Sequence, residues 1–511
     1  MTHIYDVNDR RGEALGDDME SNMLFKLKNG WTVTNEKHSD VLSYLKEHHP
    51  ETPYQEDSTG YTWDEAGIAD LFSECYDNDT RYCPEKKSWY TYDNGAWKKD
   101  TQGLLVSAKL KEFVRLLSLY CGEIEDDDRR KDYMKFVAKL GDRRMRDRIL
   151  RDAEDSMKIS AETFDKNPYL INCLNGTYDL KTGRFREHSY ADYLTMQTRF
   201  EYTVRPKKCE RWETFIDEVT QGDKEKAAFI KRSLGYSIIG TSKEECLFIL
   251  YGSTTRNGKS TLLRAVEYML GDYSEASDVA IICKRDRQKD ADAPSSLLAA
   301  LKGKRFVTMA EPDSNSRLNV AAIKQFTGGE SITARALYEK PITYVPQFTL
   351  WISCNDLPAV QDKSLFASER VKVIEFNRHF TEAEQDKTLK EYFESNEAMI
   401  GIFAWLIEGY REYRKYGLKM PECVRQTVKR YEKDNDLVVQ FLEERCERAE
   451  DVKTQAKTLY DTYKVWCKSN GYYVCSSKKF NAEVTAHPEW YTEKRRGHGN
   501  QVVYDGLTLR E

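Results

Sequence analysis

A polar loop that ends in a lysine and two hydroxyl side chains is the part of the sequence best suited to chemistry. Residues 246–261 read CLFILYGSTTRNGKST, an apolar run that stops at Gly252 and a loop that closes with Gly258, Lys259 and Ser260. Backbone N–H groups in such a loop and at the start of the following helix bind phosphate oxygens. We therefore expect Lys259 to bind the β- and γ-phosphates of a nucleotide and Ser260 to bind Mg²⁺.

This loop departs in one respect from the common phosphate-binding pattern. Five residues stand between Gly252 and Gly258, whereas the common pattern has four, so we interpret the additional residue as a bulge. A Gly-Lys-Ser turn that binds nothing is the alternative, and the strand before the loop and the helix after it disfavour that alternative. The predicted nucleotide-binding residues are Gly252, Thr254, Thr255, Arg256, Asn257, Gly258, Lys259, Ser260 and Thr261.

Other polar residues follow two further apolar runs. Glu311 and Asp313 follow the run 306–310, and Asn355 follows the run 348–354. A carboxylate at a strand end can hold Mg²⁺ and polarise an attacking water, and a neutral amide can orient that water without adding charge. Asn355 as a simple turn former is the alternative. We predict Glu311 and Ser260 as metal ligands, and Lys259, Glu311, Asp313, Asn355 and Arg370 as the catalytic residues.

Arg370 differs from these residues because it precedes an apolar run, residues 371–376, and does not follow one. The site of a parallel sheet lies at the carboxyl ends of the strands, so a residue at an amino end is poorly placed to reach the nucleotide of its own subunit. A guanidinium stays charged and presents several donors, which suits it to a neighbouring subunit's γ-phosphate. An ordinary pairing with Glu369 or Asp362 is the alternative, and Arg378 is the competing candidate.

Strands that alternate with helical stretches must position these residues. This alternation predicts an α/β fold with an open parallel sheet, and we expect the acidic strand beside the phosphate-binding strand. We divide the chain into a polar extension at 1–60, a helix-rich α+β domain at 61–208, a helical collar at 209–240, the sheet domain at 241–420 and a C-terminal domain at 421–511.

Length, charge and cysteine content restrict the class of protein. The 511 residues suffice for about three domains. A net charge of −6 argues against a globally basic nucleic-acid binder and permits local basic surfaces. The sequence has no apolar run of about twenty residues, so we expect a cytoplasmic protein without a membrane partner. The twelve cysteines are scattered singly, which favours reduced, buried thiols over structural zinc.

Three segments have a pattern typical of nucleic-acid binding, each with a simpler alternative. Arg335, Tyr338 and Lys340 lie in a predicted hairpin suited to gripping a DNA backbone, unless it is an ordinary charged surface hairpin. The basic helices at 129–151 could face nucleic acid. The alternative, which we slightly favour, is a solvated helix surface on which aspartates pair with the cations. Three short helices and a basic hairpin at 421–511 bind DNA or dock a protein.

The motifs together resemble the superfamily 3 helicases. GSTTRNGKST, VTMAEPD, IKQFTGGESITARALYEKPITYVPQ, WISCND and Arg370 occur in that order. The series is more closely similar to the phage and plasmid primase-helicase family, which includes satellite-phage and poxvirus primase-helicases. PYLINCLNGTYDLKTG and residues 212–240 resemble the helicase-associated domain of that family, so the similarity extends from about residue 61 to the C-terminus.

The resemblance implies an AAA+-like P-loop ATPase between a helix-rich α+β domain and a winged-helix-like domain. It implies a hexameric ring that uses ATP and Mg²⁺ to translocate on single-stranded DNA during phage or plasmid replication in a bacterial host. Lys259 and Ser260 take the phosphate-loop roles, Glu311 the acidic role and Asn355 the water-sensing role. Arg370 becomes the finger supplied to the neighbouring subunit.

The sequence departs from the family pattern in two respects and leaves two alternative functions open. The loop is one residue longer than the general pattern, and Pro312 separates Glu311 from Asp313, which leaves open which carboxylate holds Mg²⁺ and which is the base. The alternatives to a translocating helicase are a replication initiator or recruitment switch that hydrolyses ATP slowly, and the helicase component of a primase-helicase. Sixty N-terminal residues are too few for a primase core, so we expect a primase or polymerase partner to be a separate chain.

Overall fold

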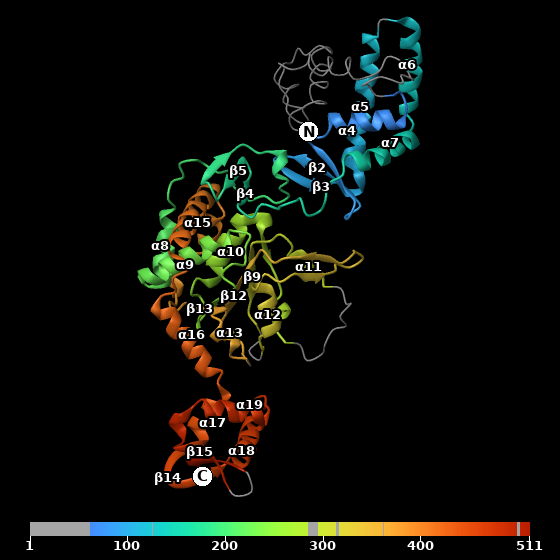
Figure 1. Cartoon of the computed structure of the whole chain (residues 1–511). Helices are drawn as coiled ribbons and strands as arrows, with labels where there is room; N and C mark the ends of the chain where they lie inside the picture. The colour runs from blue at the N-terminus through green and yellow to red at the C-terminus, as the bar shows by residue number, and fades with distance from the viewer. Residues whose placement is uncertain are drawn as a thin grey trace.

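Three folded regions follow one another along the chain in an elongated molecule (Figure 1). The structure is a computed structural model that describes residues 62–124, 126–284, 295–312, 316–360, 362–497 and 501–510. The predicted extension at 1–60 and the predicted catalytic Asp313 lie outside these residues.

The N-terminal region combines four helices with a small antiparallel sheet of order β1-β2-β3. Asn94 and Gly95 have φ of 48° and 80°, and this left-handed pair turns β2 into β3 as the Asp-Asn-Gly sequence predicts. The elements are α4 (Glu65–Cys75), β1 (Thr80–Cys83), β2 (Ser88–Asp93), β3 (Ala96–Lys99), α5 (Leu104–Tyr120), α6 (Asp127–Leu140) and α7 (Arg143–Ser156).

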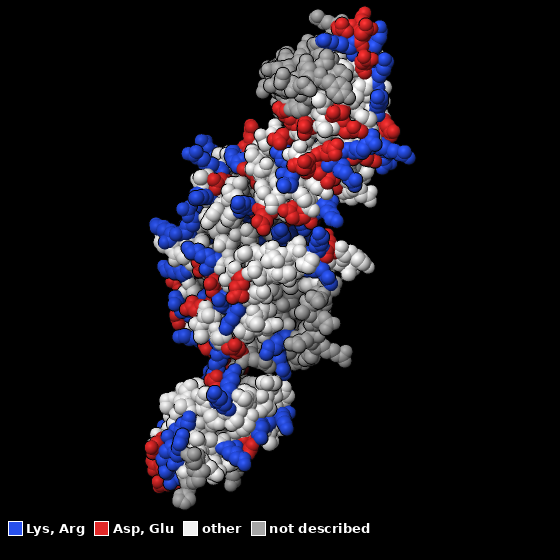
Figure 2. Space-filling model, turned by 45° about the vertical axis from the view of Figure 1, so that its right-hand side comes forward, with Lys and Arg blue, Asp and Glu red and all other residues white. Residues whose placement is uncertain are grey.

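The basic helices α6 and α7 have a mixed charge surface. Lys131 pairs with Asp128 at 3.1 Å, Lys135 with Asp132 at 2.9 Å, and Arg148 with Glu65 at 2.9 Å. Figure 2 shows blue and red side chains interleaved over this region. These pairs favour the solvated-face interpretation over a nucleic-acid surface.

A second small sheet, β4-β5-β6, joins the N-terminal region to the centre of the molecule. Its strands are Leu170–Cys173, Gly176–Asp179 and Arg184–Arg186. The buried guanidinium of Arg305 donates to the carbonyl of Leu170 at 2.8 Å and to that of Ile238 at 3.1 Å. The side chain of Asn172 donates to the carbonyl of Gly95 at 2.9 Å. Backbone carbonyls of three segments are thereby satisfied at one junction.

The central sheet has five parallel strands in the order β13-β7-β12-β9-β8. They are β7 (Leu247–Tyr251), β8 (Ser274–Ala276), β9 (Phe306–Ala310), β12 (Thr349–Cys354) and β13 (Val371–Glu375). The parallel sheet confirms the predicted α/β class. The expectation that the acidic strand neighbours the phosphate-binding strand was wrong, because β12 lies between β9 and β7.

Alternate side chains of β7, β9, β12 and β13 enter different cores. Phe248 and Leu250 of β7 belong to one core with α8 (Glu210–Thr220), α9 (Lys224–Ser237), α10 (Lys259–Leu270), α14 (Leu389–Phe393) and α15 (Asn396–Tyr416). Leu247 and Ile249 belong to the other, with α11 (Ser296–Ala300), α12 (Val320–Thr327), α13 (Ser364–Ala367) and α16 (Glu422–Asp434). A strand buried on both faces is what the continuous apolar run predicts.

The C-terminal region has its own core, built by three helices and an antiparallel sheet of order β14-β16-β15. The three helices and the basic hairpin expected here are present, and their assignment as a winged-helix-like domain stays a prediction. Its elements are α17 (Leu437–Arg445), β14 (Cys446–Gln455), α18 (Ala456–Ser469), α19 (Ser477–Thr485), β15 (Glu493–Arg496) and β16 (Val502–Leu509). Tyr431 of α16 is buried in the core of the central sheet, so the two cores divide after α16, later than residue 421.

The twelve cysteines are present as thiols and nine of them are buried. No described helix is long and apolar enough to cross a membrane, and the described part of the chain contains no cluster of three potential metal-binding His, Cys, Asp or Glu. The 3-10 turns are Thr101–Gly103, Cys121–Glu123, Tyr190–Asp192, Gly271–Tyr273, Val279–Ile281, Glu382–Glu384 and Pro488–Trp490.

Candidate functional site

The loop between β7 and α10 is shaped by its two glycines. Gly258 caps α10 with φ of 89°, and a Cβ there would lie 2.5 Å from Cγ1 of Val219 in α8. A Cβ on Gly252 would lie 2.5 Å from Nδ2 of Asn257. Both positions therefore require glycine, for backbone conformation at Gly258 and for close packing at each.

Side chains of the loop divide into those that shape it and those that face solvent. Asn257 is buried and donates to the carbonyl of Thr254 at 2.6 Å, which closes the loop from inside. The backbone N–H of Phe380 donates to the carbonyl of Arg256 at 2.9 Å, so the segment after β13 supports the loop. The remaining predicted residues Thr254, Thr255, Arg256 and Ser260 are exposed, and Thr261 is half-buried.

Lys259 is buried at the first position of α10, with 5% of its surface exposed. Its Nζ donates to the carbonyl of Gly252 at 3.1 Å and to Oδ1 of Asn355 at 3.0 Å. Burial lowers the pKa of Lys259, against the opposing influence of Cys354 and Glu311. A buried ammonium held by two neutral oxygens is ready to exchange those contacts for phosphate oxygens.

Glu311 lies where β9 ends, two strands from the loop. Its φ is 38°, and its backbone N–H donates to the carbonyl of Ser353 at 2.9 Å. A left-handed glutamate is uncommon and costs energy, and such strain is concentrated at functional sites. Its side chain is exposed. Because β12 lies between β9 and β7, Asn355 stands between Glu311 and the loop, as its predicted role requires.

Oxygen ligands suit a Mg²⁺ ion at this edge of the sheet. The Ser260 hydroxyl and the Glu311 carboxylate are exposed oxygen donors, and magnesium prefers such donors together with water. These residues fit the ion that the motif implies. The choice between Glu311 and Asp313 as ligand or base stays a prediction.

Arg370 lies at the opposite end of the sheet. It directly precedes β13, whose first residue Val371 is in register with Leu247 at the start of β7. Arg370 Nη1 donates to Oγ1 of Thr327 at 2.8 Å, and its Nη2 pairs with Glu245 at 2.5 Å. The alternative partners expected from sequence, Glu369 and Asp362, were wrong: Glu369 pairs with Lys372 instead.

The competing arginine has a different environment. Arg378 follows β13 at the carboxyl edge of the sheet and pairs with Glu384 at 2.5 Å. Its guanidinium covers the ring of Phe380 at 5.0 Å. Arg378 therefore lies on the same edge as the phosphate loop of its own chain, whereas Arg370 is remote from it.

The predicted hairpin is formed by β10 (Ile332–Ala334) and β11 (Ile342–Tyr344). Arg335, Tyr338 and Lys340 all lie in the connection between these short strands. Tyr338 is 98% exposed and its neighbour Leu337 is 57% exposed. Sequence reasoning missed Leu337, although an apolar residue beside the tyrosine of a polar turn was a visible signal. The connection combines the exposed Tyr338 ring with the exposed Lys340 and the half-buried Arg335, beside the exposed Glu339. An aromatic ring with cations suits single-stranded nucleic acid.

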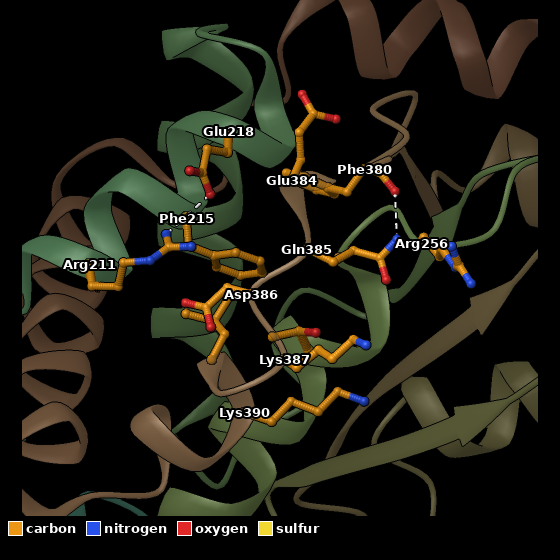
Figure 3. A pocket seen from close by; sticks show the side chains of 13 residues that line it. Arg211, Phe215, Glu218, Arg256, Phe380, Glu384, Gln385, Asp386, Lys387 and Lys390 are labelled. Atoms are coloured by element: carbon orange, nitrogen blue, oxygen red, sulfur yellow. Dashed lines mark hydrogen bonds and ion pairs between the residues drawn. The ribbon is translucent and has the colours of Figure 1, made fainter. Parts of the chain in front are cut away.

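A pocket beside the phosphate loop was not predicted at all. It has a volume of about 370 Å³ and lies between α8, the loop and the segment 380–390 (Figure 3). No local motif could have indicated it, because its walls come from three segments far apart in sequence.

Comparison with protein families gives matches over three consecutive parts of the chain. Residues 69–221 match the family described as D5 N terminal like, and residues 433–504 match the family described as poxvirus D5 protein-like. Residues 250–370, which include the phosphate loop and Asn355, match a family of unknown function, DUF5906.

Three curated relatives of this chain come from viruses. The chain is 27% identical to a protein of Acanthamoeba polyphaga mimivirus provisionally named a helicase, over 76% of this chain and 44% of that protein. It is 24% identical to a similarly named protein of Invertebrate iridescent virus 3, over 60% of this chain and 36% of that protein. A provisionally named primase of African swine fever virus is 22% identical, over 67% and 35%. The chain thus spans less than half the length of these relatives.

Among solved structures, the C-terminal region of NrS-1 is similar over 87% of this chain and 99% of that one, with a TM-score of 0.47 and 10% identity. The two D5 family matches flank the parallel-sheet region on both sides. The chain is therefore similar to D5-like proteins at residues 69–221 and 433–504, and to viral proteins provisionally named helicase and primase.

Proposed function

We propose that this chain is an ATP-driven, ring-forming helicase that translocates on single-stranded DNA during replication of a virus, phage or plasmid. The observation that carries the proposal is the meeting of Lys259, Asn355 and Glu311 at one edge of the parallel sheet. Lys259 and Asn355 are in contact, and Glu311 follows the strand beside that of Asn355. The names of the viral relatives support the replication context.

In this proposal each residue of the site has a separate role in ATP hydrolysis. When Lys259 turns to the phosphates, Oδ1 of Asn355 loses its present donor and can accept a hydrogen bond from water instead. Glu311 would polarise that water if it is the base, and Ser260 would hold Mg²⁺, which would supply positive charge beside the phosphoryl group. Arg370 lies too far along the sheet to serve its own loop, which supports the assembly of several subunits with shared sites.

The hairpin connects this chemistry to DNA. Only residues 345–348 separate β11 from β12, the strand that ends at Asn355. A movement of the hairpin with DNA therefore reaches the nucleotide site through one continuous segment.

Nucleotide hydrolysis by purified protein tests the proposal. We expect Mg²⁺-dependent ATP hydrolysis that single-stranded DNA stimulates. Lys259→Ala should abolish it while circular dichroism stays native, because Lys259 makes polar contacts at the site and belongs to neither core. Normal turnover by Lys259→Ala would overturn the assignment.

A second function is favoured by one comparison. The African swine fever virus relative is provisionally named a primase, and the chain covers 35% of it. The helicase component of a primase-helicase is therefore the alternative, and a purified primase partner that raises hydrolysis or unwinding would support it.

A further inference from the structure

The pocket beside the phosphate loop differs from the loop in composition. Phe215 and Leu389 provide apolar walls, while Arg256, Gly258 and Thr261 are shared with the loop itself. The ring of Phe215 lies directly against the loop, since a Cβ at Gly258 would be 3.2 Å from its Cε2. The volume of about 370 Å³ falls within the usual range of about 300–1,000 Å³ for small-molecule sites.

The carboxylates around the pocket are already engaged by other groups. Glu218 pairs with Arg211 at 3.1 Å, and Glu384 pairs with Arg378. Asp386 accepts from the backbone N–H and hydroxyl of Thr388 at 3.0 and 2.7 Å. A ligand therefore meets few free acceptors in these walls.

Apart from Arg211, the cations that line the pocket are not engaged in this way. Arg256, Lys387 and Lys390 line it, and none of the three forms an ion pair with another residue that the structure describes. In Figure 3 the side chains of Lys387 and Lys390 run side by side in the direction of Arg256. Three cations without a carboxylate partner, next to an apolar wall, suit a ligand that is apolar at one end and anionic at the other.

We propose that this pocket receives the nucleoside end of a nucleotide, with the base against Phe215 and Phe380 and the α-phosphate side near Lys387 and Lys390. The inference rests on the proposed nucleotide function and adds residues that the phosphate-loop motif does not contain. Arg378 covers one face of the Phe380 ring at 5.0 Å and so holds that ring in place. The collar helix α8 thereby becomes part of the nucleotide site.

The affinities of two probes distinguish binding in the pocket from binding at the phosphate loop. AMP-PNP carries base, ribose and phosphates, whereas inorganic tripolyphosphate carries phosphates alone. Calorimetry with the full chain should show tighter binding of AMP-PNP. Phe380→Ala should weaken AMP-PNP about 5- to 100-fold, the range known for base stacking on aromatic rings, and leave tripolyphosphate unchanged. Phe215 is unsuitable for this test because it belongs to the core.

Two further variants and a control sharpen the result. Gln385→Trp adds bulk to the pocket wall and should act like Phe380→Ala, and Lys387→Ala combined with Lys390→Ala should weaken AMP-PNP about tenfold. Lys181→Ala, an exposed lysine outside the pocket, should change neither probe. The pocket proposal is overturned if Phe380→Ala and Gln385→Trp leave AMP-PNP affinity unchanged. Failure of both probes to bind the unmodified chain would instead overturn the nucleotide function itself.

Discussion

Glu311 combines an exposed carboxylate with a left-handed backbone conformation at the end of β9. Its left-handed φ of 38° fixes the direction of the side chain at the end of β9. Replacing the carboxylate by an amide keeps its size but removes its negative charge, and with it the proposed role of Glu311 as base or metal ligand.

We predict that Glu311→Gln binds Mg·ATP yet hydrolyses it at least about a hundredfold more slowly, within the range of general-base contributions. Filter binding and phosphate release measure the two properties separately. If Asp313→Asn is severe and Glu311→Gln is mild, the roles of the two carboxylates must be exchanged.

At the scale of elements, apolar patterning predicted most of the central sheet and little of its order. β7, β9, β12 and β13 were each visible as apolar runs, because strands buried on both faces have no polar face to interrupt them. β8, with the sequence Ser-Glu-Ala, was missed because an edge strand of three residues has no such run. The position of β12 between β7 and β9 is a non-local pairing, which no local pattern encodes.

The candidate site was likewise predictable only where local sequence patterns define it. The loop, Glu311 and Asn355 were identifiable from motif and order, whereas the contact of Lys259 with Asn355 and the partner of Arg370 depend on strand order. The pocket depends on three separate segments and was invisible from sequence.

The hairpin is the element through which we expect DNA to act. Lys340 is exposed in its connection, so Lys340→Ala should weaken single-stranded DNA binding and lower the slope of log affinity against log salt by about 0.7. Basal ATP hydrolysis should persist, because Lys340 is not among the residues of the nucleotide site. An unchanged slope with unchanged unwinding would place the DNA elsewhere.

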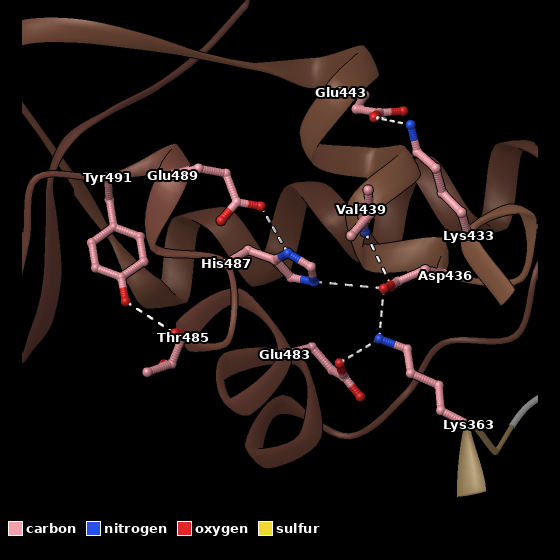
Figure 4. Close-up of polar contacts among 10 residues, drawn as sticks. All are labelled: Lys363, Lys433, Asp436, Val439, Glu443, Glu483, Thr485, His487, Glu489 and Tyr491. Atoms are coloured by element: carbon pink, nitrogen blue, oxygen red, sulfur yellow. Dashed lines mark hydrogen bonds and ion pairs between the residues drawn. The ribbon is translucent and has the colours of Figure 1, made fainter. Parts of the chain in front are cut away.

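At the scale of the whole molecule, one lysine joins the central and C-terminal regions (Figure 4). Lys363, just before α13, pairs with Asp436 at 2.5 Å and with Glu483 of α19 at 2.6 Å. Burial opposes the charge, but these hydrogen bonds outweigh burial and raise the pKa of Lys363. His487 lies 3.6 Å from the same Asp436 carboxylate.

We predict that Lys363→Ala loosens this junction by about 1–3 kcal/mol, because two partly buried carboxylates lose their cation. Proteolysis near residues 434–437 should accelerate. Lys433→Ala removes a surface pair with Glu443 in the same region and is the matched control. Equal proteolysis of both variants would show that Lys363 does not hold the regions together.

The position of Arg370 leads us to predict that it acts at the nucleotide site of a neighbouring subunit. Lys259→Ala and Arg370→Ala subunits should each be inactive, yet a mixture should regain part of the ATPase activity, because some interfaces pair an intact loop with an intact arginine. Absence of recovery at every ratio, with mixed assemblies verified, would mean that Arg370 does not act across subunits. Its contacts with Glu245 and Thr327 would then be its role.

Strand displacement on forked DNA tests the central claim most directly. A labelled strand should be released from forks with single-stranded tails when Mg·ATP is present, and release should stop with AMP-PNP or with Lys259→Ala. Subunit counting by electron microscopy under the same conditions would show the ring. ATP hydrolysis without strand release on forks with either tail polarity would contradict the account and favour a nucleotide-dependent initiator or recruitment switch.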